Sequence, residues 1–352
     1  MEIFKADMNI DFVGKSKYAF ILSMLLIVLT LFSILFHKGI NLGIDFAGGT
    51  LVEVKFAKKD ISIDDVRDAL KEIGLGSSII QRFGEEDILI KTELSEAGKI
   101  GDRIQSALED KFSKDSFTIQ RVEMVGPAAG EALKLKGENA LLYSIIGMII
   151  YISYRFQNRI AIPIIAVALI TWMLSTTSWI SVTALSIASL VATIAACIWF
   201  NFRQALAAII ALIHDAVITL GFLSVTNKEF TLPVLAAILT IIGYSINDTI
   251  VVFDRIRENL SKRKDMPLRE LINKSINETM SRTIITSGLT LLAVLSIFIF
   301  GGAVIHDFAF ALLVGVIIGT YSSIYIASPI LITWENVAQK RKKEEILRRR
   351  KR

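Results

Sequence analysis

Residues 243–252 have the sequence Gly-Tyr-Ser-Ile-Asn-Asp-Thr-Ile-Val-Val, which places a carboxylate, Asp248, late in an apolar run over about 231–254. A run of about 20 apolar residues is long enough to cross the roughly 30 Å hydrocarbon core of a bilayer as a helix. An ionisable side chain there costs about 2.5–3.5 kcal/mol on insertion scales, so by default it marks a functional site. The stretch therefore predicts a transmembrane helix and a site inside it.

The rest of the chain contains more runs of this kind. With 53% hydrophobic residues over 352 positions, the composition is typical of an integral membrane protein. No small-residue cleavage motif follows the first run, so we expect it to remain as an anchor and not to be a signal peptide. Eight candidate spans lie at about 18–36, 138–155, 160–179, 181–200, 204–225, 231–254, 283–304 and 308–333.

Basic residues gather on one side of this topology. Loops on the opposite side, such as 176–178 and 226–229, have almost no excess of positive charge. The positive-inside rule therefore places both termini in the cytoplasm and requires an even number of spans. The same rule explains the basic C-terminal tail at 335–352. Nucleic-acid binding by this tail is a less simple alternative. The loops on the basic side contain Arg155, Arg159, Arg203, Arg255, Arg257, Lys262, Arg263 and Lys264.

Five parts follow from this topology. They are a cytoplasmic N-terminus (1–17), a first span (18–36), an exported domain (37–136), a bundle of spans 2–8 (137–334) and a basic cytoplasmic tail (335–352). Within the bundle, the pattern of residues 152–156 is repeated at 198–202, and that of 168–171 at 216–219. The segment 158–203 is therefore predicted to be an inserted or duplicated hairpin of two spans, with chance similarity of composition as the alternative.

The predicted exported domain has a mixed periodicity. Val52, Val54 and Phe56 alternate with charged residues, as in a half-buried strand. Ser62 is placed to cap a helix that ends before Gly74. The order strand, helix, strand, strand, helix, strand predicts a ferredoxin-like α/β domain of the split βαβ type. The later elements are expected near 78–82, 87–91, 100–112 and 117–124.

Further ionisable residues lie in the spans next to Asp248. His214 and Asp215 are in the span before it, and Arg282 opens the span after it. In hydrocarbon, desolvation favours a neutral carboxyl group and a nearby cation favours the ionised form, so a conformational change can switch its protonation. We therefore predict that Asp248, Arg282, Asp215 and His214 form a proton relay. The alternative is a static polar cluster that fixes the register of the helices.

Other polar and small residues are expected to have simpler roles. The run Asp254–Glu258 has charges at i,i+3 spacing and is predicted to anchor a helix at the membrane surface. His306 and Asp307 are expected in a solvated loop, with a proton entry point as the alternative. A last group, Gly315, Gly319, Ser322 and Ser323, is expected to permit close helix packing.

Enzyme motifs are missing from the sequence. There is no HExxH, no GxSxG and no phosphate-binding loop, and histidines 37, 214 and 306 do not have metal-site spacing. A single cysteine, Cys197, excludes a disulfide within the chain and a cysteine-based metal site. We therefore expect no catalytic residue, no metal and no cofactor. An intramembrane hydrolase that uses Asp215 and Asp248 is the alternative.

Five motifs in order resemble the SecF subunits of the SecDF protein-export complex, a branch of the RND superfamily. Each motif alone is weak, but the ordered set is specific and covers nearly the whole chain. The extra hairpin at 158–203 is the one departure from the six spans of that family. The motifs are Gly43-Ile44-Asp45-Phe46-Ala47-Gly48-Gly49-Thr50, Val125-Gly126-Pro127, Ile213-His214-Asp215, the run 243–259 with Asn247, Asp248, Asp254 and Arg255, and the run 277–288 with Arg282.

The resemblance implies an RND-type polytopic membrane bundle of α-helices with one exported α/β domain. It implies a SecD-like partner, association with the SecYEG channel, and proton-driven assistance to preproteins that cross the bacterial inner membrane. It also implies that Asp248 and Arg282 take part in proton passage. No nucleic-acid partner is expected, because a stop signal after the final span explains the basic tail more simply. Two alternatives stay open, namely an RND-type exporter of a lipid or small hydrophobic molecule, and a purely structural stabiliser of the translocon.

Overall fold

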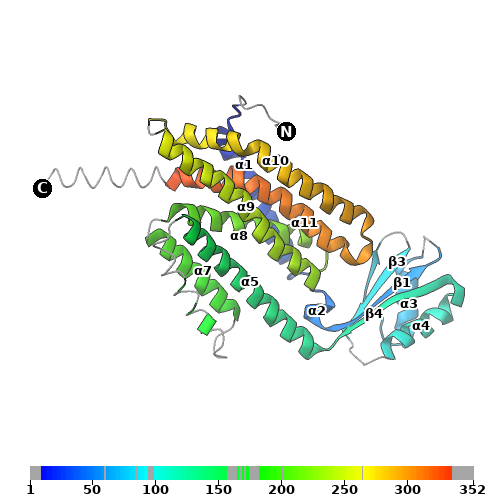
Figure 1. The fold of residues 1–352 in the computed structure, drawn as a ribbon. Coiled ribbons are helices and arrows are strands. Elements are labelled where there is room, and N and C mark those ends of the chain that lie inside the picture. Colours follow the sequence, from blue (N-terminus) through cyan, green and yellow to red (C-terminus); the bar gives the residue numbers. More distant parts are fainter. Residues whose placement is uncertain are drawn as a thin grey trace. The chain divides into compact units, whose positions relative to one another are not determined.

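The computed structural model divides into two compact units (Figure 1). One consists of Asn41–Gly137 together with Glu229–Leu232, and the other contains the remainder of the chain. The first unit is an α/β domain and the second is a helical bundle. The structure describes residues 9–58, 61–83, 86–93, 99–156, 165, 169, 172–173, 182–199, 202–263 and 265–334.

A four-stranded antiparallel sheet with the order β2-β3-β1-β4 forms the α/β domain. Two strands of one βαβ unit are separated by a strand of the other, which is the split βαβ arrangement, so the predicted ferredoxin-like fold is confirmed. The elements are α2 (Ile44–Ala47), β1 (Gly49–Phe56), α3 (Ile63–Glu72), β2 (Ile79–Phe83), β3 (Asp87–Thr92), α4 (Lys99–Lys111), a 3-10 turn (Lys114–Ser116) and β4 (Phe117–Val125).

Local chemistry accounts for these elements. Ser62 accepts a hydrogen bond from the backbone N–H of Asp64 at 3.2 Å, which is the cap predicted for α3. The chain leaves this helix through Gly74, whose φ of +79° favours glycine. Val52, Ile90 and Leu108 are fully buried in one apolar core between the sheet and its helices. The core therefore holds both helices against one face of the sheet.

Six of the described helices are long and apolar enough to cross a membrane. They span Phe12–Phe36, Pro127–Phe156, Arg203–Val225, Leu232–Lys262, Leu268–Phe300 and Val304–Trp334. The predicted span at 160–179 lies outside the described residues except for 165, 169, 172 and 173, and the basic tail at 335–352 lies outside them altogether. The helices are α1 (Phe12–Phe36), α5 (Pro127–Phe156), α7 (Val182–Trp199), α8 (Arg203–Val225), α9 (Leu232–Lys262), α10 (Leu268–Phe300) and α11 (Ala303–Ser322), with a π-helical turn at Ser323–Ala327.

Small residues let the helices of the bundle approach one another. In Figure 1, α8 lies beside α1 and α11, and α10 lies beside α11. A Cβ added to Gly319 would lie 2.9 Å from the Cβ of Ser245, and one added to Gly315 would lie 2.2 Å from the Cδ1 of Ile241. The predicted packing role of Gly315 and Gly319 is therefore confirmed.

Two asparagines of α10 hold the start of α1. Asn273 accepts hydrogen bonds from the backbone N–H groups of Phe12 and Val13 at 2.9 and 3.2 Å. Asn277 accepts from the N–H of Ile10 and donates to its carbonyl oxygen, both at 2.9 Å. The first N–H groups of a helix have no partner within it, so Asn273 acts as a cap supplied by another helix.

Candidate functional site

Two polar clusters lie inside the helical bundle, and α9 and α11 contribute to both. We name them after their carboxylates. The Asp215 cluster consists of Ser23, His214, Asp215, Ser245, Tyr321 and Ser322. The Asp248 cluster consists of Tyr244, Asp248, Ser287, Thr290 and Thr320.

Both carboxylate oxygens of Asp215 are in hydrogen bonds. Its Oδ2 accepts from the hydroxyl groups of Ser245 at 2.5 Å and Ser322 at 2.8 Å, while its Oδ1 is 2.9 Å from the Nδ1 of His214. The side chain of Asp215 is 1% exposed. Three helices, α8, α9 and α11, are therefore joined through one carboxylate, because a buried carboxylate is stable only where donors replace its water.

The Asp215 cluster continues to α1. The Nε2 of His214 is 2.9 Å from the hydroxyl of Ser23, and that hydroxyl is 3.0 Å from the hydroxyl of Tyr321. Tyr321 in turn donates to the backbone carbonyl of Ala19 at 2.6 Å. A backbone carbonyl only accepts and each hydroxyl has one hydrogen, so Ser23 donates to Tyr321 and accepts from the Nε2–H of His214.

The Asp248 cluster has fewer donors. Ser287 of α10 donates to the Oδ2 of Asp248 at 3.1 Å, and Thr320 of α11 donates to the Ser287 hydroxyl at 2.8 Å. The hydroxyl of Tyr244 donates to Ser287 at 3.4 Å and to Thr290 at 3.3 Å. Asp248 is 4% exposed. Its carboxylate is thus buried with one hydroxyl donor among the described residues, which leaves its other oxygen available to accept or carry a proton.

Arg282 lies on α10, the helix that contributes Ser287. It interacts with Asp248 through space, but the two side chains make no ion pair within 4 Å in the described part of the chain. Arg282 is exposed, whereas Asp248 is buried. The positive charge of Arg282 favours negative charge on the Asp248 carboxylate without neutralising it in a fixed contact among the described residues.

The four residues predicted as a relay therefore fall into two groups. His214 contacts Asp215, and Arg282 acts on Asp248. Ser245, which binds Asp215, is on α9 one turn before Asp248. On α11, Thr320 belongs to the Asp248 cluster and Ser322 to the Asp215 cluster. The two clusters are therefore neighbours on both helices, although no described hydrogen bond joins them.

Hydroxyl residues are the part of the site that the sequence did not reveal. Ser245, Ser287 and Thr320 are not distinguished by spacing, because serine and threonine also occur in spans where they bond to their own helix. Thr286 and Ser296 do this, donating to backbone carbonyls four residues earlier. Ser322 was predicted to serve packing, whereas its hydroxyl donates to Asp215. What distinguishes the hydroxyls of Ser245, Ser287 and Ser322 is a buried carboxylate on a facing helix, 30, 39 and 107 residues away in the sequence, and only the fold brings it close.

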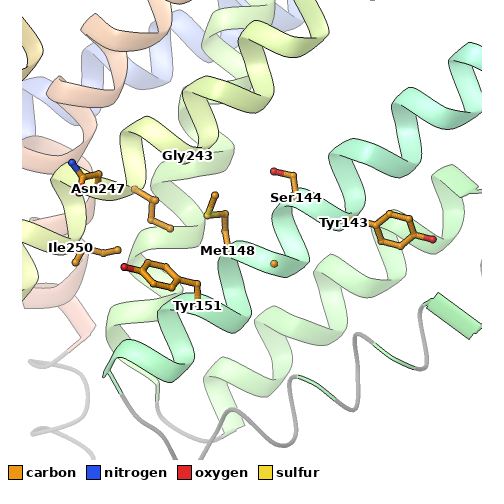
Figure 2. Close-up of a pocket in the computed structure, with 9 residues that line it drawn as sticks. Tyr143, Ser144, Met148, Tyr151, Gly243, Asn247 and Ile250 are labelled. Atoms are coloured by element: carbon orange, nitrogen blue, oxygen red, sulfur yellow. The ribbon is translucent and has the colours of Figure 1, made fainter. Parts of the chain in front are cut away.

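A pocket of about 480 Å³ lies between α5 and α9 (Figure 2). Asn247 lines it together with Ile250 from α9, and Met148 and Tyr151 of α5 lie on the side that faces them, whereas the ring of Tyr143 points away from α9. Asn247 is exposed, whereas its neighbour Asp248 is buried and is not among the lining residues. The pocket and the Asp248 carboxylate are therefore on different faces of α9.

Backbone geometry explains why the first motif has glycine at positions 48 and 49. Gly48 and Gly49 have φ of +74° and +114°, which other residues rarely adopt. A Cβ on Gly49 would also lie 2.3 Å from the carbonyl oxygen of Thr92, and one on Gly48 would lie 3.2 Å from the Cα of Pro127. The two motifs are thus in contact within the α/β domain. In the second motif, Gly126 accepts a hydrogen bond from the N–H of Gly130 at 3.0 Å, as α5 begins at Pro127.

Asp45 and Phe46 of the first motif contact the connection between α8 and α9. Asp45 accepts from the N–H of Leu232 at 2.8 Å, and the ring of Phe46 lies 5.5 Å from that of Phe230. Both contacts are internal to the unit formed by Asn41–Gly137 and Glu229–Leu232. The first motif therefore contacts the segment Glu229–Leu232 of the same chain, and the sequence did not reveal this contact.

The charged end of α9 is an ion-pair network. Asp254 pairs with Arg155 of α5 at 2.5 Å. Arg255 pairs with Glu258 at 2.7 Å, as predicted from the i,i+3 spacing, and also with Glu278 of α10 at 2.6 Å. These side chains are partly exposed, so solvent screening keeps the contribution of each pair to stability small.

His306 and Asp307 were expected in a solvated loop, and this prediction was wrong. Both lie in α11, which begins at Ala303 because Gly302, with φ of +71°, ends a two-residue connection after α10. Asp307 pairs with Lys228 at 2.6 Å. The pair connects the second turn of α11 to Lys228, three residues after the end of α8. Among the described residues, no group of three or more histidine, cysteine or acidic side chains is placed to hold a metal ion.

Two protein-family models match the chain. The model "Protein export membrane protein SecD/SecF, C-terminal" matches residues 104–190 and 174–337, and the model "SecD/SecF GG Motif" matches residues 33–60. The second match contains the glycines whose geometry is described above.

Known proteins are similar over almost the whole chain. The protein translocase subunit SecF of Calditerrivibrio nitroreducens is 43% identical over 337 residues, which cover 94% of this chain and 96% of the relative. The subunit of the same name from Magnetococcus marinus is 40% identical over 338 residues, with 94% of each chain covered.

Solved structures of SecDF have the same fold. The crystal structure of SecDF from Thermus thermophilus, a translocon-associated membrane protein, has a TM-score of 0.70 and 32% identity, covering 95% of this chain. A SecDF structure in the super-membrane-facing form has a TM-score of 0.60 and 31% identity. This chain spans only 40% of the length of the first of these and 41% of the second. With its five motifs, its fold and its relatives taken together, the chain belongs to the SecF branch of the SecD/SecF family of protein-export membrane proteins.

Proposed function

We propose that this chain couples the proton motive force to the export of preproteins, together with a SecD-like subunit and the SecYEG channel in the bacterial inner membrane. The observation that carries the proposal is the environment of Asp248. This carboxylate is buried in a membrane-spanning helix with one hydroxyl donor, and an exposed arginine acts on it without pairing. A titratable group that is buried inside a membrane span with few hydrogen-bond partners marks a functional site.

Proton uptake by Asp248 changes what α9 binds. The ionised carboxylate accepts from Ser287 and attracts Arg282, whereas the neutral carboxyl group can itself donate and is no longer attracted by the arginine. Both partners lie on α10, so the protonation state of Asp248 biases the packing of α9 against α10. In our proposal, alternation between the two packings drives the export step.

The topology that goes with this function has both termini in the cytoplasm and the α/β domain outside. The basic residues of the sequence support this orientation through the positive-inside rule. The boundaries proposed for the domain are 37–136, with an additional two-span hairpin at 158–203. The proposal of a SecD-like partner is supported by the solved SecDF chains, of which this chain corresponds to about 40%.

The proposal is tested by export of a radiolabelled preprotein into inverted membrane vesicles that contain the channel, the SecD-like subunit and this chain. Export is measured with and without an uncoupler. We expect Asp248→Asn to lose the uncoupler-sensitive part of export while the complex still assembles. The reason is that asparagine is close to isosteric with aspartate but cannot exchange a proton. Assembly is checked by co-purification of the SecD-like subunit.

Asp254→Asn is the matched control. It makes the same chemical change on the same helix, but at a partly exposed ion pair with Arg155 and away from the Asp248 cluster. Export by this variant should stay within about twofold of wild type, because an exposed pair contributes little. Full uncoupler-sensitive export by Asp248→Asn would reject the coupling role and would favour a purely structural stabiliser of the translocon.

A further inference from the structure

The connection between α8 and α9 belongs to the α/β unit and not to the bundle. Its residues, Glu229–Leu232, cluster with Asn41–Gly137, although the helices on either side of the connection belong to the other unit. Leu232 is also the first residue of α9, the helix that contains Asp248. The chain thus passes from the α/β unit directly into the helix that carries the proposed proton site.

Backbone hydrogen bonds hold the connection. The N–H of Gly43 donates to the carbonyl oxygen of Phe230 at 2.9 Å, and the N–H of Phe230 donates to the carbonyl oxygen of Asn41 at 2.7 Å. Leu42 and Phe230 thereby form a parallel β-bridge. Such a bridge fixes the register between the two segments independently of their side chains.

Side chains add an electrostatic contact. Lys91 of β3 pairs with Glu229 at 3.6 Å and donates to the carbonyl oxygen of Leu42. The side chains of Lys91 and Glu229 are only 11% and 16% exposed, so the pair is less screened by water than the other pairs of the α/β domain. Through Lys91, the central strand β3 is connected to both segments of the bridge.

Asp45 caps α9 from outside that helix. Its Oδ2 accepts from the N–H of Leu232 at 2.8 Å. The first N–H groups of a helix lack partners within it, and a carboxylate at that end is also favoured by the helix dipole. The next residue is Pro233, which has no N–H. The N–H of Leu232 is therefore the first of only a few backbone donors at this end of α9 that need a partner from outside the helix. Loss of the Asp45 carboxylate therefore removes both a hydrogen bond and a favourable charge.

Gly43 brings the two segments to within contact distance. A Cβ added to Gly43 would lie 2.7 Å from the Cγ2 of Thr231. The backbone of Gly43 has φ of −67°, so it does not need glycine for its conformation and needs it only for space. The bridge residue Leu42, Gly43 and Asp45 lie within four consecutive residues, at the start of the first sequence motif.

We propose that Asn41–Phe46 is a clamp that holds Glu229–Leu232, and with it the first residue of α9, permanently against the α/β domain, with Asp45 as its positioning residue. Asp248 is on the same helix, 16 residues beyond Leu232, so in our proposal a movement of α9 acts on the domain through the clamped connection. This inference rests on the proposed proton-driven cycle. It assigns to the first motif a mechanical role that is separate from proton transfer.

A disulfide tests whether the clamp stays closed. Gly43→Cys and Thr231→Cys are combined in a Cys197→Ser background, which removes the one natural cysteine. The short distance between these positions suits a disulfide. If the clamp is permanent, the oxidised variant exports at least as well as the same variant after reduction. A fivefold or larger loss of export on oxidation, reversed by a reductant, would show that the segments must separate and would overturn the inference.

Removal of the positioning residue tests whether the clamp is needed. We expect Asp45→Ala to lower export about tenfold while proton flux, followed with a pH-sensitive dye in the vesicles, stays within twofold of wild type. Oxidation of the cysteine pair in the Asp45→Ala chain should restore export, since it supplies the connection by another bond. Unchanged export by Asp45→Ala, or no rescue by oxidation, would overturn the inference. Co-purification of the SecD-like subunit confirms that the variant folds.

Thr231→Asp separates the clamp from simple helix capping. In the Asp45→Ala background it returns a carboxylate to the start of α9 but makes no connection to Asn41–Phe46. We expect no rescue of export. Rescue would mean that Asp45 acts only as a cap, and the inference would fail.

Failure of the proposed function has a different signature. If the wild-type complex conducts no protons, or if Asp248→Asn exports fully, then proton coupling is rejected. The oxidation and rescue experiments still report on the clamp in that case, because their readout is export of one variant in two redox states.

Discussion

The two buried carboxylates of the bundle differ in how completely they are solvated by the protein. Asp215 uses both oxygens, which two serine hydroxyls and a histidine contact. Asp248 has one serine on one oxygen and an arginine that does not reach it. Both side chains are almost fully buried, at 1% and 4% exposure. Burial therefore does not distinguish them, but the number of donors does.

This difference indicates which carboxylate can change state. A carboxylate with every oxygen satisfied resists both movement and protonation, since either change leaves several buried donors unpaired. A carboxylate with one donor loses little when it takes up a proton. We therefore interpret the Asp215 cluster as a joint between α1, α8, α9 and α11, and the Asp248 cluster as the site that switches. The intramembrane-hydrolase alternative is not supported by this arrangement, because one Asp215 oxygen binds two hydroxyls and the other contacts His214.

The largest expected effect on stability comes from Asp215→Leu. The change keeps the branched shape of the side chain but leaves His214, Ser245 and Ser322 without their acceptor, and breaking a buried pair in this way costs about 3–5 kcal/mol. The midpoint of thermal unfolding in detergent should fall strongly, and less folded protein should be recovered. Asp248→Leu is the matched variant and should lower the midpoint much less. Equal losses for the two variants would contradict the distinction between joint and switch.

Gly319→Val should have the next largest effect. Gly319 packs on Ser245, where even a Cβ would lie 2.9 Å away, so a larger side chain must push α11 from α9. Overpacking of this kind costs about 1–3 kcal/mol. Thermal unfolding measures the cost, with Gly288→Val as the control because nothing lies within 4 Å of a Cβ at that glycine. A tolerated Gly319→Val would mean that the two helices are not held at this distance.

Ser322→Ala should cost less than 1 kcal/mol. It removes one of the two hydroxyls that donate to Asp215, while Ser245 and His214 remain. Hydrogen bonds between membrane helices contribute on average about 0.6 kcal/mol. Unfolding of Ser322→Ala, Ser245→Ala and the double variant forms a mutant cycle. Strictly additive losses would show that the hydroxyls do not act as one joint.

Ser287→Ala should have the smallest effect on stability and a measurable effect on export. It removes the hydroxyl that contacts Asp248, and Thr320 keeps its second hydrogen bond, to the carbonyl of Val316. We expect a change in unfolding of about 0.6 kcal/mol or less and a several-fold decrease in uncoupler-sensitive export. Ser296→Ala, which removes a hydroxyl bonded only to its own helix, is the control. A Ser287→Ala variant with normal export would leave Asp248 without a demonstrated partner.

The sequence predicted the architecture because its signals are local. Alternating residues such as Val52 and Val54, the Ser62 cap and the long apolar runs are each set by a few neighbours along the chain, and the structure has the corresponding strands and helices. The sequence also identified Asp248, because a carboxylate in an apolar span is costly wherever its partners are. It misplaced His306 and Asp307, because the two-residue turn that precedes α11 depends on the φ of Gly302.

Only the tertiary structure decided which residues surround the two carboxylates and what the first motif contacts. Ser287 lies 39 residues from Asp248, and Ser322 lies 107 residues from Asp215, so no periodicity along one helix relates them. Asp45 and Leu232 are 187 residues apart and meet through one hydrogen bond. Such contacts depend on how whole helices and the sheet pack, whereas the cost of a buried charge or an unpaired N–H is a property of the residue itself. The sequence therefore showed where the protein needs partners, and the fold supplied them.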